Sequence, residues 1–282
     1  MSLRRPSAKN PLPITADNIR MVALYLNVSE RRALLVSSRE LHWVVAPLLY
    51  RSLEVACLPR SWNEEEEANA HLPFLILTSL VQSMRPRGRL TPRCNAQYLV
   101  SFSYCSHILE ADFRAVPLIG EILRVAFRLR HLRIDVGGDG VPVILKIFHR
   151  VDLIISPTST LTALGVFHHR VTLPCLESVR SSHIAIVDAL MRYRSIATVV
   201  IDTSPSEANL KTFFRAHPPW NANSLRRLAL GYTVHVAPTD IYRAIYVSFP
   251  NIEHLEVRVS GVGGLTLIDV SAMMPLLGTA IS

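Results

Sequence analysis

The stretch of sequence that decides the fold is residues 34–55, LLVSSRELHWVVAPLLYRSLEV. Its first half carries apolar residues at helical spacing, and they fall on one face: Leu34, Leu41, Val45 and Leu48. Pro47 has no backbone N–H and disfavours the helical conformation of Ala46, so we expect the helix to end there. Residues 50–55 then alternate as a strand does. The stretch therefore joins a helical unit to the first strand of the segment that follows.

Two folded units are expected on either side of this joint. The chain divides into a polar, disordered tail (1–10), a helical unit (11–49) and a larger second domain (50–282). In the helical unit we expect one helix over residues 12–26 and another over 29–46, with Ser29 as the N-cap of the second.

The composition is that of a globular protein whose basic residues are mostly arginine. Hydrophobic residues make up 49% and charged residues 18% of the 282 residues, which is too apolar for a disordered chain. The 30 basic residues include only Lys9, Lys146 and Lys211 as lysines. Residues 1–60 hold nine basic and four acidic residues, so the rest of the chain holds 21 basic and 18 acidic residues. Because a nucleic-acid-binding solenoid would concentrate positive charge, we expect no nucleic-acid partner.

Metal binding, secretion and a membrane span are not indicated. The cysteines form no C-x-x-C pair and no zinc-ligand spacing with histidine: Cys57, Cys94, Cys105 and Cys175. The longest uncharged run, residues 153–169, is interrupted by Pro157 and falls short of a membrane span. No apolar stretch follows Arg4 and Arg5 as it would in a signal peptide. We expect reduced thiols, no metal, no cofactor, no membrane partner, and a location in the cytoplasm and/or nucleus.

A short motif, apolar-x-x-apolar-x-apolar, recurs along the second domain and is typical of the strand of a leucine-rich repeat. Copies start at Leu99, Leu129, Leu161, Ile196, Leu225 and Ile252, with a plausible first copy at Tyr50 and a degenerate one at Leu176. Segments with helical spacing lie between them, over residues 116–127, 184–194, 206–216 and 239–248. The interval between Leu161 and Leu176 is too short for a full unit, so we expect the unit at Leu176 to be collapsed or without a helix. The predicted fold class is α/β: a helical unit followed by an irregular leucine-rich-repeat solenoid, with parallel strands and helices on the outer face.

No catalytic motif is present in the sequence. The glycine-rich runs 137–140 and 261–264 match no phosphate-binding loop and are interpreted as turns that follow strands. The adjacent His168 and His169 would point to opposite faces of a strand and have no third metal ligand at a useful spacing. Neither G-x-S-x-G nor H-E-x-x-H occurs. We therefore expect no catalytic residues and a protein that is not an enzyme.

The N-terminal residues resemble a known motif. The run L-V-S-x-R, formed by Leu35, Val36, Ser37 and Arg39, and the run A-P-L-L-Y-R-S-L at 46–53 resemble the second half of an F-box in fungal-type F-box proteins. The first half of an F-box resembles a second set of residues in this chain: Leu12, Pro13, Ile19, Val22 and Leu26. In this family an F-box is followed by leucine-rich repeats. The resemblance implies a substrate-recognition subunit of a Skp–cullin–F-box ubiquitin ligase, which performs no chemistry itself.

For the helical unit, the resemblance implies binding of a Skp-family adaptor. The adaptor would in turn bind a cullin complex. The candidate adaptor-binding residues are apolar: Leu12, Pro13, Ile19, Val22, Val36 and Trp43. The alternative is a leucine-rich-repeat scaffold for protein interactions with no ubiquitin-ligase role, in which the helical unit is only an N-terminal cap. The sequence VSER at residues 28–31 stands where the family commonly has an Asp-Leu pair, which favours the alternative.

A target protein would bind the repeats, whose strands present their x positions on a concave surface. The candidate partner-binding residues at these positions are Arg130, Arg133, Arg226, Arg227, Glu256 and Arg258. The strands that start at Leu161 and Ile196 carry only small residues there, so we expect a small-residue trough between charged walls. Arginine forms bidentate bonds with carboxylates and phosphates, so an acidic or phosphorylated segment is expected at both arginine pairs, Arg130–Arg133 and Arg226–Arg227.

Overall fold

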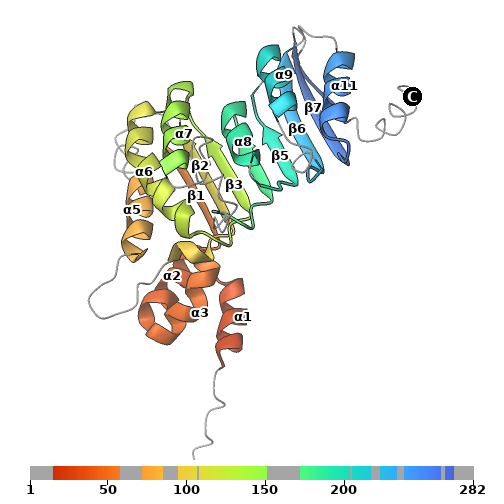
Figure 1. The fold of residues 1–282 in the computed structure, drawn as a ribbon. Coiled ribbons are helices and arrows are strands. Elements are labelled where there is room, and N and C mark those ends of the chain that lie inside the picture. Colours follow the sequence, from red (N-terminus) through yellow and green to blue (C-terminus); the bar gives the residue numbers. More distant parts are fainter. Residues whose placement is uncertain are drawn as a thin grey trace, which may run out of the picture. The chain divides into compact units, whose positions relative to one another are not determined.

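The computed structural model of the chain is shown in Figure 1 and divides into two compact units, Met1–Arg51 and Ser52–Ser282. The structure describes residues 15–57, 72–84, 95–106, 108–150, 172–192, 194–203, 205–216, 223–233, 238–261 and 264–269.

The first unit contains three helices, α1 (Ala16–Tyr25), α2 (Val28–Ser37) and α3 (Arg39–Leu49). Asn27 caps α2: its side chain accepts from the Glu30 N–H, and the Glu30 carboxylate accepts from the Asn27 N–H, which is a capping box. The prediction that Ser29 is the N-cap is therefore wrong, because Asn27 satisfies the same backbone groups two residues earlier. Arg31 of α2 donates to the carbonyl oxygens of Ala23 and Leu24 at 2.8 and 3.0 Å and so ties α2 to the end of α1.

The single helix expected over residues 29–46 is two helices. Ser38 has extended backbone angles, φ −152° and ψ 163°, and its side chain accepts from the Leu41 N–H as the N-cap of α3. The helix does not end at Ala46 either, because Pro47 lies inside α3. A proline in the last turn removes one hydrogen bond, and the turn still closes because the Tyr50 N–H donates to the Ala46 carbonyl at 2.9 Å.

The second unit is built on a sheet whose strands follow one another in chain order. The strands are β1 (Ser52–Cys57), β2 (Ser101–Ser106), β3 (His131–Asp135), β4 (Ser178–Ser181), β5 (Thr198–Ile201), β6 (Arg227–Thr233), β7 (His254–Gly261) and β8 (Gly264–Asp269). Neighbours from β1 to β7 are parallel, and β8 is antiparallel to β7. The α/β class is confirmed, whereas β8 was not expected. Its pairing of Gly261 with Gly264 agrees with the turn predicted at those glycines.

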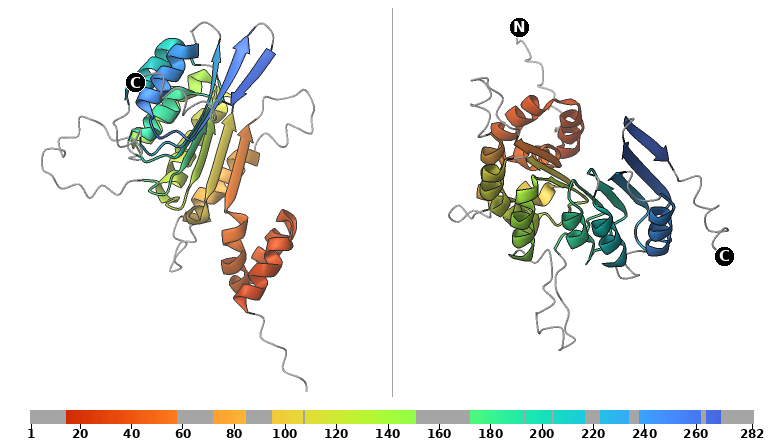
Figure 2. Two further views of the ribbon diagram at one scale, coloured as in Figure 1. Left: turned by 90° about the vertical axis from the view of Figure 1, so that its right-hand side faces the viewer. Right: turned by 90° about the horizontal axis from the view of Figure 1, so that it is seen from above.

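Helices connect the parallel strands and lie along one face of this sheet (Figure 2). They are α5 (Leu72–Met84), α6 (Leu109–Val125), α7 (Val141–Arg150), α8 (Ile184–Met191), α9 (Glu207–Ala216) and α11 (Pro238–Ser248), with short 3-10 turns at Asn95–Tyr98 and Gly138–Gly140. Strand and helix therefore alternate through most of this unit. The opposite face of the sheet, which we call the open face, is not covered by any of these helices.

The unit at Leu176 is complete, so the prediction that it is collapsed or lacks a helix is wrong. It contains β4 and is followed by α8, and β4 is hydrogen-bonded directly to β3. The prediction depended on the short interval that starts at Leu161, a motif that lies outside the described residues. The strand before β4 in the sheet is β3, a full unit earlier in the chain.

The apolar positions of the repeated motif form the core between sheet and helices. One row across neighbouring strands consists of Phe102, Leu132, Val179, Val199, Leu228 and Leu255, all buried. Burying each such side chain stabilises the fold by about 1.5–3 kcal/mol. In the degenerate copy Ser181 takes the last apolar position; it is fully buried, and its Oγ accepts from the His183 N–H at 3.1 Å. This hydrogen bond allows a polar residue in the core.

A buried hydrogen bond links β2 to α6 beneath a glycine. The Tyr104 hydroxyl donates to Asp112 Oδ1 at 2.8 Å, and both residues are fully buried. Burial, together with this bond to Asp112, raises the pKa of Tyr104 far above its usual value, so the hydroxyl keeps its proton. A Cβ on Gly140 would lie 2.6 Å from Asp112 Oδ2 and 3.2 Å from Val136 Cβ. Gly140 is thus the residue that lets the 3-10 turn approach the carboxylate.

Replacing Gly140 with alanine is expected to destabilise the protein by about 1–3 kcal/mol, because the added methyl group forces Asp112 away from Tyr104. The free energy of unfolding in urea measures this loss. Gly138→Ala, in the same turn, is the matched control because nothing lies within 4 Å of its added Cβ. Equal losses for the two variants would show that the carboxylate is not tightly held.

Candidate functional site

The open face of the sheet carries the side chains that point away from the helices. One row across it, set by the strand register, runs Glu54, Ser103, Arg133, Arg180, Val200, Ala229 and Glu256. The row is charged at β1, β3, β4 and β7 and has short apolar side chains at β5 and β6. Long polar side chains therefore stand on both sides of two strands that bear short ones.

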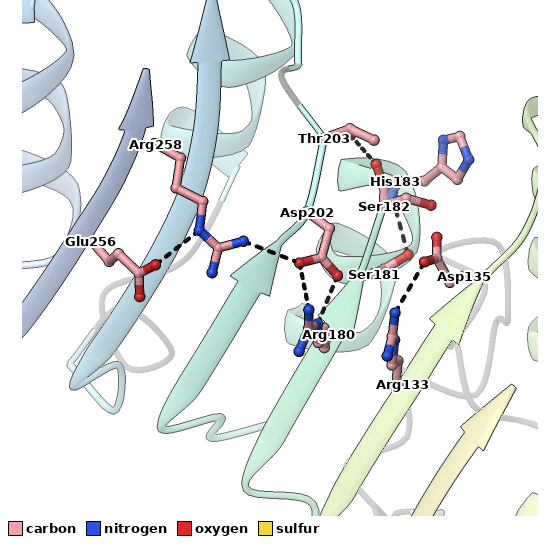
Figure 3. Close-up of polar contacts among 10 residues, drawn as sticks. All are labelled: Arg133, Asp135, Arg180, Ser181, Ser182, His183, Asp202, Thr203, Glu256 and Arg258. Carbon is pink, nitrogen blue, oxygen red and sulfur yellow. Dashed lines mark hydrogen bonds and ion pairs between the residues drawn. The ribbon is translucent and has the colours of Figure 1, made fainter. Parts of the chain in front are cut away.

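A network of ion pairs crosses these strands (Figure 3). Asp202 follows β5, and its carboxylate accepts from Arg180 Nε and Nη2 at 2.7 and 3.0 Å. Arg258 Nη1 lies 3.6 Å from the same carboxylate, and Arg258 Nε donates to Glu256 Oε1 at 2.8 Å. Gly231 lies between them on β6, paired with Arg258, and its lack of a side chain leaves a path for the long Arg258 side chain over β6. One carboxylate is therefore held by two guanidinium groups from strands on either side of it.

These hydrogen bonds hold the arginine side chains in one orientation. The hydrogen bonds to Asp202 raise the pKa of Arg180, which stays fully charged. A planar guanidinium bound in this bidentate way is fixed in direction as well as position. Arg180 is thus presented to solvent in a defined geometry.

A second pair lies one strand away. Arg133 Nη2 donates to Asp135 Oδ2 at 3.4 Å, and Asp135 is buried. Among the residues that the structure describes, Asp135 Oδ1, Arg133 Nε and the Ser182 Oγ are buried without a hydrogen-bond partner. Buried polar atoms of this kind are usually satisfied by ordered water.

The turn after β4 is fixed by short polar contacts. The Thr203 hydroxyl donates to the Ser182 carbonyl (Figure 3). His183 Nε2 lies 2.7 Å from the Val136 carbonyl, so this nitrogen carries the proton. The ends of β3, β4 and β5 are joined by these contacts, and Asp202 is next to them in the chain.

The predicted partner-binding residues all lie on or beside strands of the open face. Each of the five arginines has a carboxylate within 4 Å: Arg130 with Glu177, Arg133 with Asp135, Arg226 with Glu253, Arg227 with Glu256, and Arg258 with Glu256 and Asp202. Two strands separate the two predicted arginine pairs: β4, which carries Arg180 on the open face, and β5, which carries the short side chains of Thr198 and Val200 there. The sequence reasoning missed Arg180 and Asp202, which complete the network. Arg180 could have been found, since it occupies an x position of the copy dismissed as degenerate.

The small-residue trough is partly wrong. The Leu161 strand that would supply half of it lies outside the described residues, and β5 has β4, with Arg180, as its neighbour. The short side chains belong to β5 and β6 instead, at Thr198, Val200 and Ala229. The prediction left out the copy at Leu176, whose strand β4 places Arg180 beside Val200 of β5.

Four of the six predicted adaptor-binding residues lie on the helices of the first unit: Ile19 and Val22 on α1, Val36 on α2 and Trp43 on α3. Leu12 and Pro13 lie outside the described residues, Ile19 is half-buried, and Val22, Val36 and Trp43 are exposed. Other large apolar residues of this unit are also exposed, and the sequence reasoning did not select them: Met21, Leu24, Tyr25 and Val28. Seven large apolar side chains are therefore exposed on the three helices of this unit, among the residues that the structure describes.

Comparison with known proteins does not assign a family. No family model matches the chain, and no curated protein matches it.

Within the described ranges, no group of three or more His, Cys, Asp or Glu residues could hold a metal ion. No described helix is both long and apolar enough to cross a membrane.

Proposed function

We propose that the chain is the substrate-recognition subunit of a Skp–cullin–F-box ubiquitin ligase. The observation that carries the proposal is the set of apolar side chains left exposed on the three helices of the first unit, where Val36 is 80% and Val22 59% exposed. Exposed apolar surface of this density marks a protein-binding site, and these residues belong to the stretch that resembles an F-box. A Skp-family adaptor is the partner that the resemblance implies.

The second unit supplies the other half of the proposed role. Its alternating strands and helices, with buried apolar positions on one face of the sheet, resemble a leucine-rich-repeat region. Its open face offers charged side chains to a target protein. Such a subunit catalyses nothing; it raises the effective concentration of a target lysine near the conjugating enzyme that the cullin complex recruits.

A repeat scaffold without a ligase role is the second candidate. The observation that favours it is the start of α2, where Asn27 and Glu30 form a capping box in the place where the family commonly has an Asp-Leu pair. In this candidate the first unit only caps the repeats, and its apolar residues would bind no adaptor.

Co-expression of the full chain with a Skp-family adaptor separates the two candidates. Under the ligase proposal, affinity purification of the chain recovers the adaptor in a stoichiometric complex that remains intact in gel filtration. Recovery of the chain alone would support the scaffold and overturn the ligase role.

A further inference from the structure

In the network around Asp202 the arginine side chains are more exposed than the carboxylate side chains that hold them. The side chains of Arg180 and Arg258 are 44% and 32% exposed, whereas Asp202 between them is 17% exposed. Asp135 is likewise less exposed than Arg133. A partner that approaches this face therefore meets arginine N–H groups before it meets carboxylate oxygens.

Both guanidinium groups keep donors for a partner. Arg180 uses Nε and Nη2 on Asp202, and Arg258 uses Nε on Glu256 and Nη1 on Asp202. In the part of the chain that the structure describes, Arg180 Nη1 and Arg258 Nη2 make no ion pair or hydrogen bond. Because both side chains are already oriented, a ligand that binds them orders fewer rotamers than it would on mobile arginines.

The strands between these arginines carry short side chains in this part of the open face. Val200 and Ala229 are the open-face residues of β5 and β6, and Gly231 follows on β6. Val200 is half-buried, and Ala229 and Gly231 are buried, so the exposed polar groups here are those of the flanking arginines. An acidic side chain of a peptide that lies across these strands can therefore reach the two guanidinium groups.

We propose that an acidic segment of a partner protein binds across β4–β7 of the open face, with a carboxylate between Arg180 and Arg258. This deepens the proposed function, on which it rests for the role of that partner as the ligase target. The site differs from the arginine pairs expected at Arg130–Arg133 and Arg226–Arg227, because it is centred on Asp202, whose carboxylate lies 2.7 Å from Arg180 Nε and 3.6 Å from Arg258 Nη1.

The same surface is poorly suited to nucleic acid. The ion-paired residues of its central block are four arginines, Arg133, Arg180, Arg227 and Arg258, and three carboxylates, Asp135, Asp202 and Glu256. The balance is a single positive charge, whereas nucleic-acid binding requires a strongly positive surface and usually aromatic side chains that stack on bases. A partner with one or two well-placed carboxylates fits this balance better.

The test uses the full chain and random peptides displayed on phage. Selection on the immobilised chain is expected to enrich peptides that carry Asp or Glu, and a synthetic copy of the most enriched peptide then serves as the probe. Arg180→Gln and Arg258→Gln should each weaken its binding by about tenfold, and Arg180→Lys should weaken it too because lysine cannot make the bidentate contact. Enriched peptides without acidic residues would overturn the proposal.

Arg192→Gln is the matched control. Arg192 also pairs with a carboxylate through Nε and Nη2, that of Asp188, but lies directly after α8 and not on the open face. If Arg192→Gln weakens peptide binding as much as Arg180→Gln, net charge and not the site explains the binding, and the proposal fails. Release of the peptide by polyuridine at a lower concentration than by free peptide would identify a nucleic-acid surface instead.

Adaptor co-purification in the same variants separates this inference from the proposed function. The arginine variants should retain the adaptor while losing the peptide. A chain that binds acidic peptides at Arg180 and Arg258 but recovers no adaptor leaves the site standing and removes the ligase role. A chain that recovers the adaptor but selects no acidic peptide supports the ligase role and overturns the acidic-peptide site.

Discussion

Replacing Val36 with lysine is expected to abolish recovery of a Skp-family adaptor, with binding weakened by about 30-fold or more. Val36 is the most exposed of the described adaptor-binding candidates and lies one residue before the end of α2. A charge there would be buried without a partner when the adaptor covers the helix, and truncating a central interface residue alone costs about 2 kcal/mol or more. A lysine near a helix C-terminus is favourable in the free chain, so the fold should be kept.

Val247→Lys is the control for this change. Val247 is 72% exposed, close to the 80% of Val36, and also lies one residue before the end of its helix, α11 in the second unit. The two variants carry the same added charge in the same helical position. Gel filtration of each variant co-expressed with the adaptor measures the result. Equal recovery of the adaptor by both variants would show that α2 is not the binding surface.

The sequence predicted which residues are buried better than it predicted where the helices begin and end. Every copy of the repeated motif that falls in the described residues from Leu99 onward lies on a strand, because apolar-x-x-apolar-x-apolar reports burial on one side of an extended segment. The prediction of helix ends depended on weaker signals. Proline was expected to end α3, but its cost is small in the last turn, where few hydrogen bonds remain to be lost.

The open-face network shows why the site was harder to predict than the core. Its centre, Asp202, interacts with Arg180 and Arg258, which are far from it in the chain and are brought near only by strand order. Arg180 was not among the candidates because the copy of the motif that contains it, at Leu176, was interpreted as degenerate. Periodicity predicts which face a residue occupies, whereas an ion pair also requires knowing which strand is its neighbour.

A buried arginine three residues after the end of α8, Arg194, is the residue whose loss should destabilise the second unit most clearly. Arg194 is 5% exposed; its Nε and Nη2 donate to the Thr172 carbonyl at 3.0 and 2.9 Å, and its Nη1 donates to the Leu190 carbonyl at 3.3 Å. Burial lowers the pKa of Arg194 to about 10, so the guanidinium remains charged at neutral pH. Leu173, next to the carbonyl that accepts twice, has φ 60°, a left-handed conformation that costs about 1–2 kcal/mol for a non-glycine residue. Arg194 therefore holds a strained turn ahead of β4 in place.

Arg194→Ala is expected to destabilise the protein by about 3 kcal/mol or more, because it leaves a cavity and removes the donors that hold the Thr172 and Leu190 carbonyls. Arg194→Lys should cost less, since it keeps the charge and much of the volume but cannot donate in the same fork. Urea unfolding followed by circular dichroism measures the free energy of unfolding of Arg194→Ala, of Arg194→Lys and of the control variant Arg192→Ala. Arg192 pairs with Asp188 on the surface of α8, and its loss should change stability by no more than about 1 kcal/mol. If Arg194→Ala proves as mild as Arg192→Ala, the strained turn at Leu173 does not depend on the buried guanidinium.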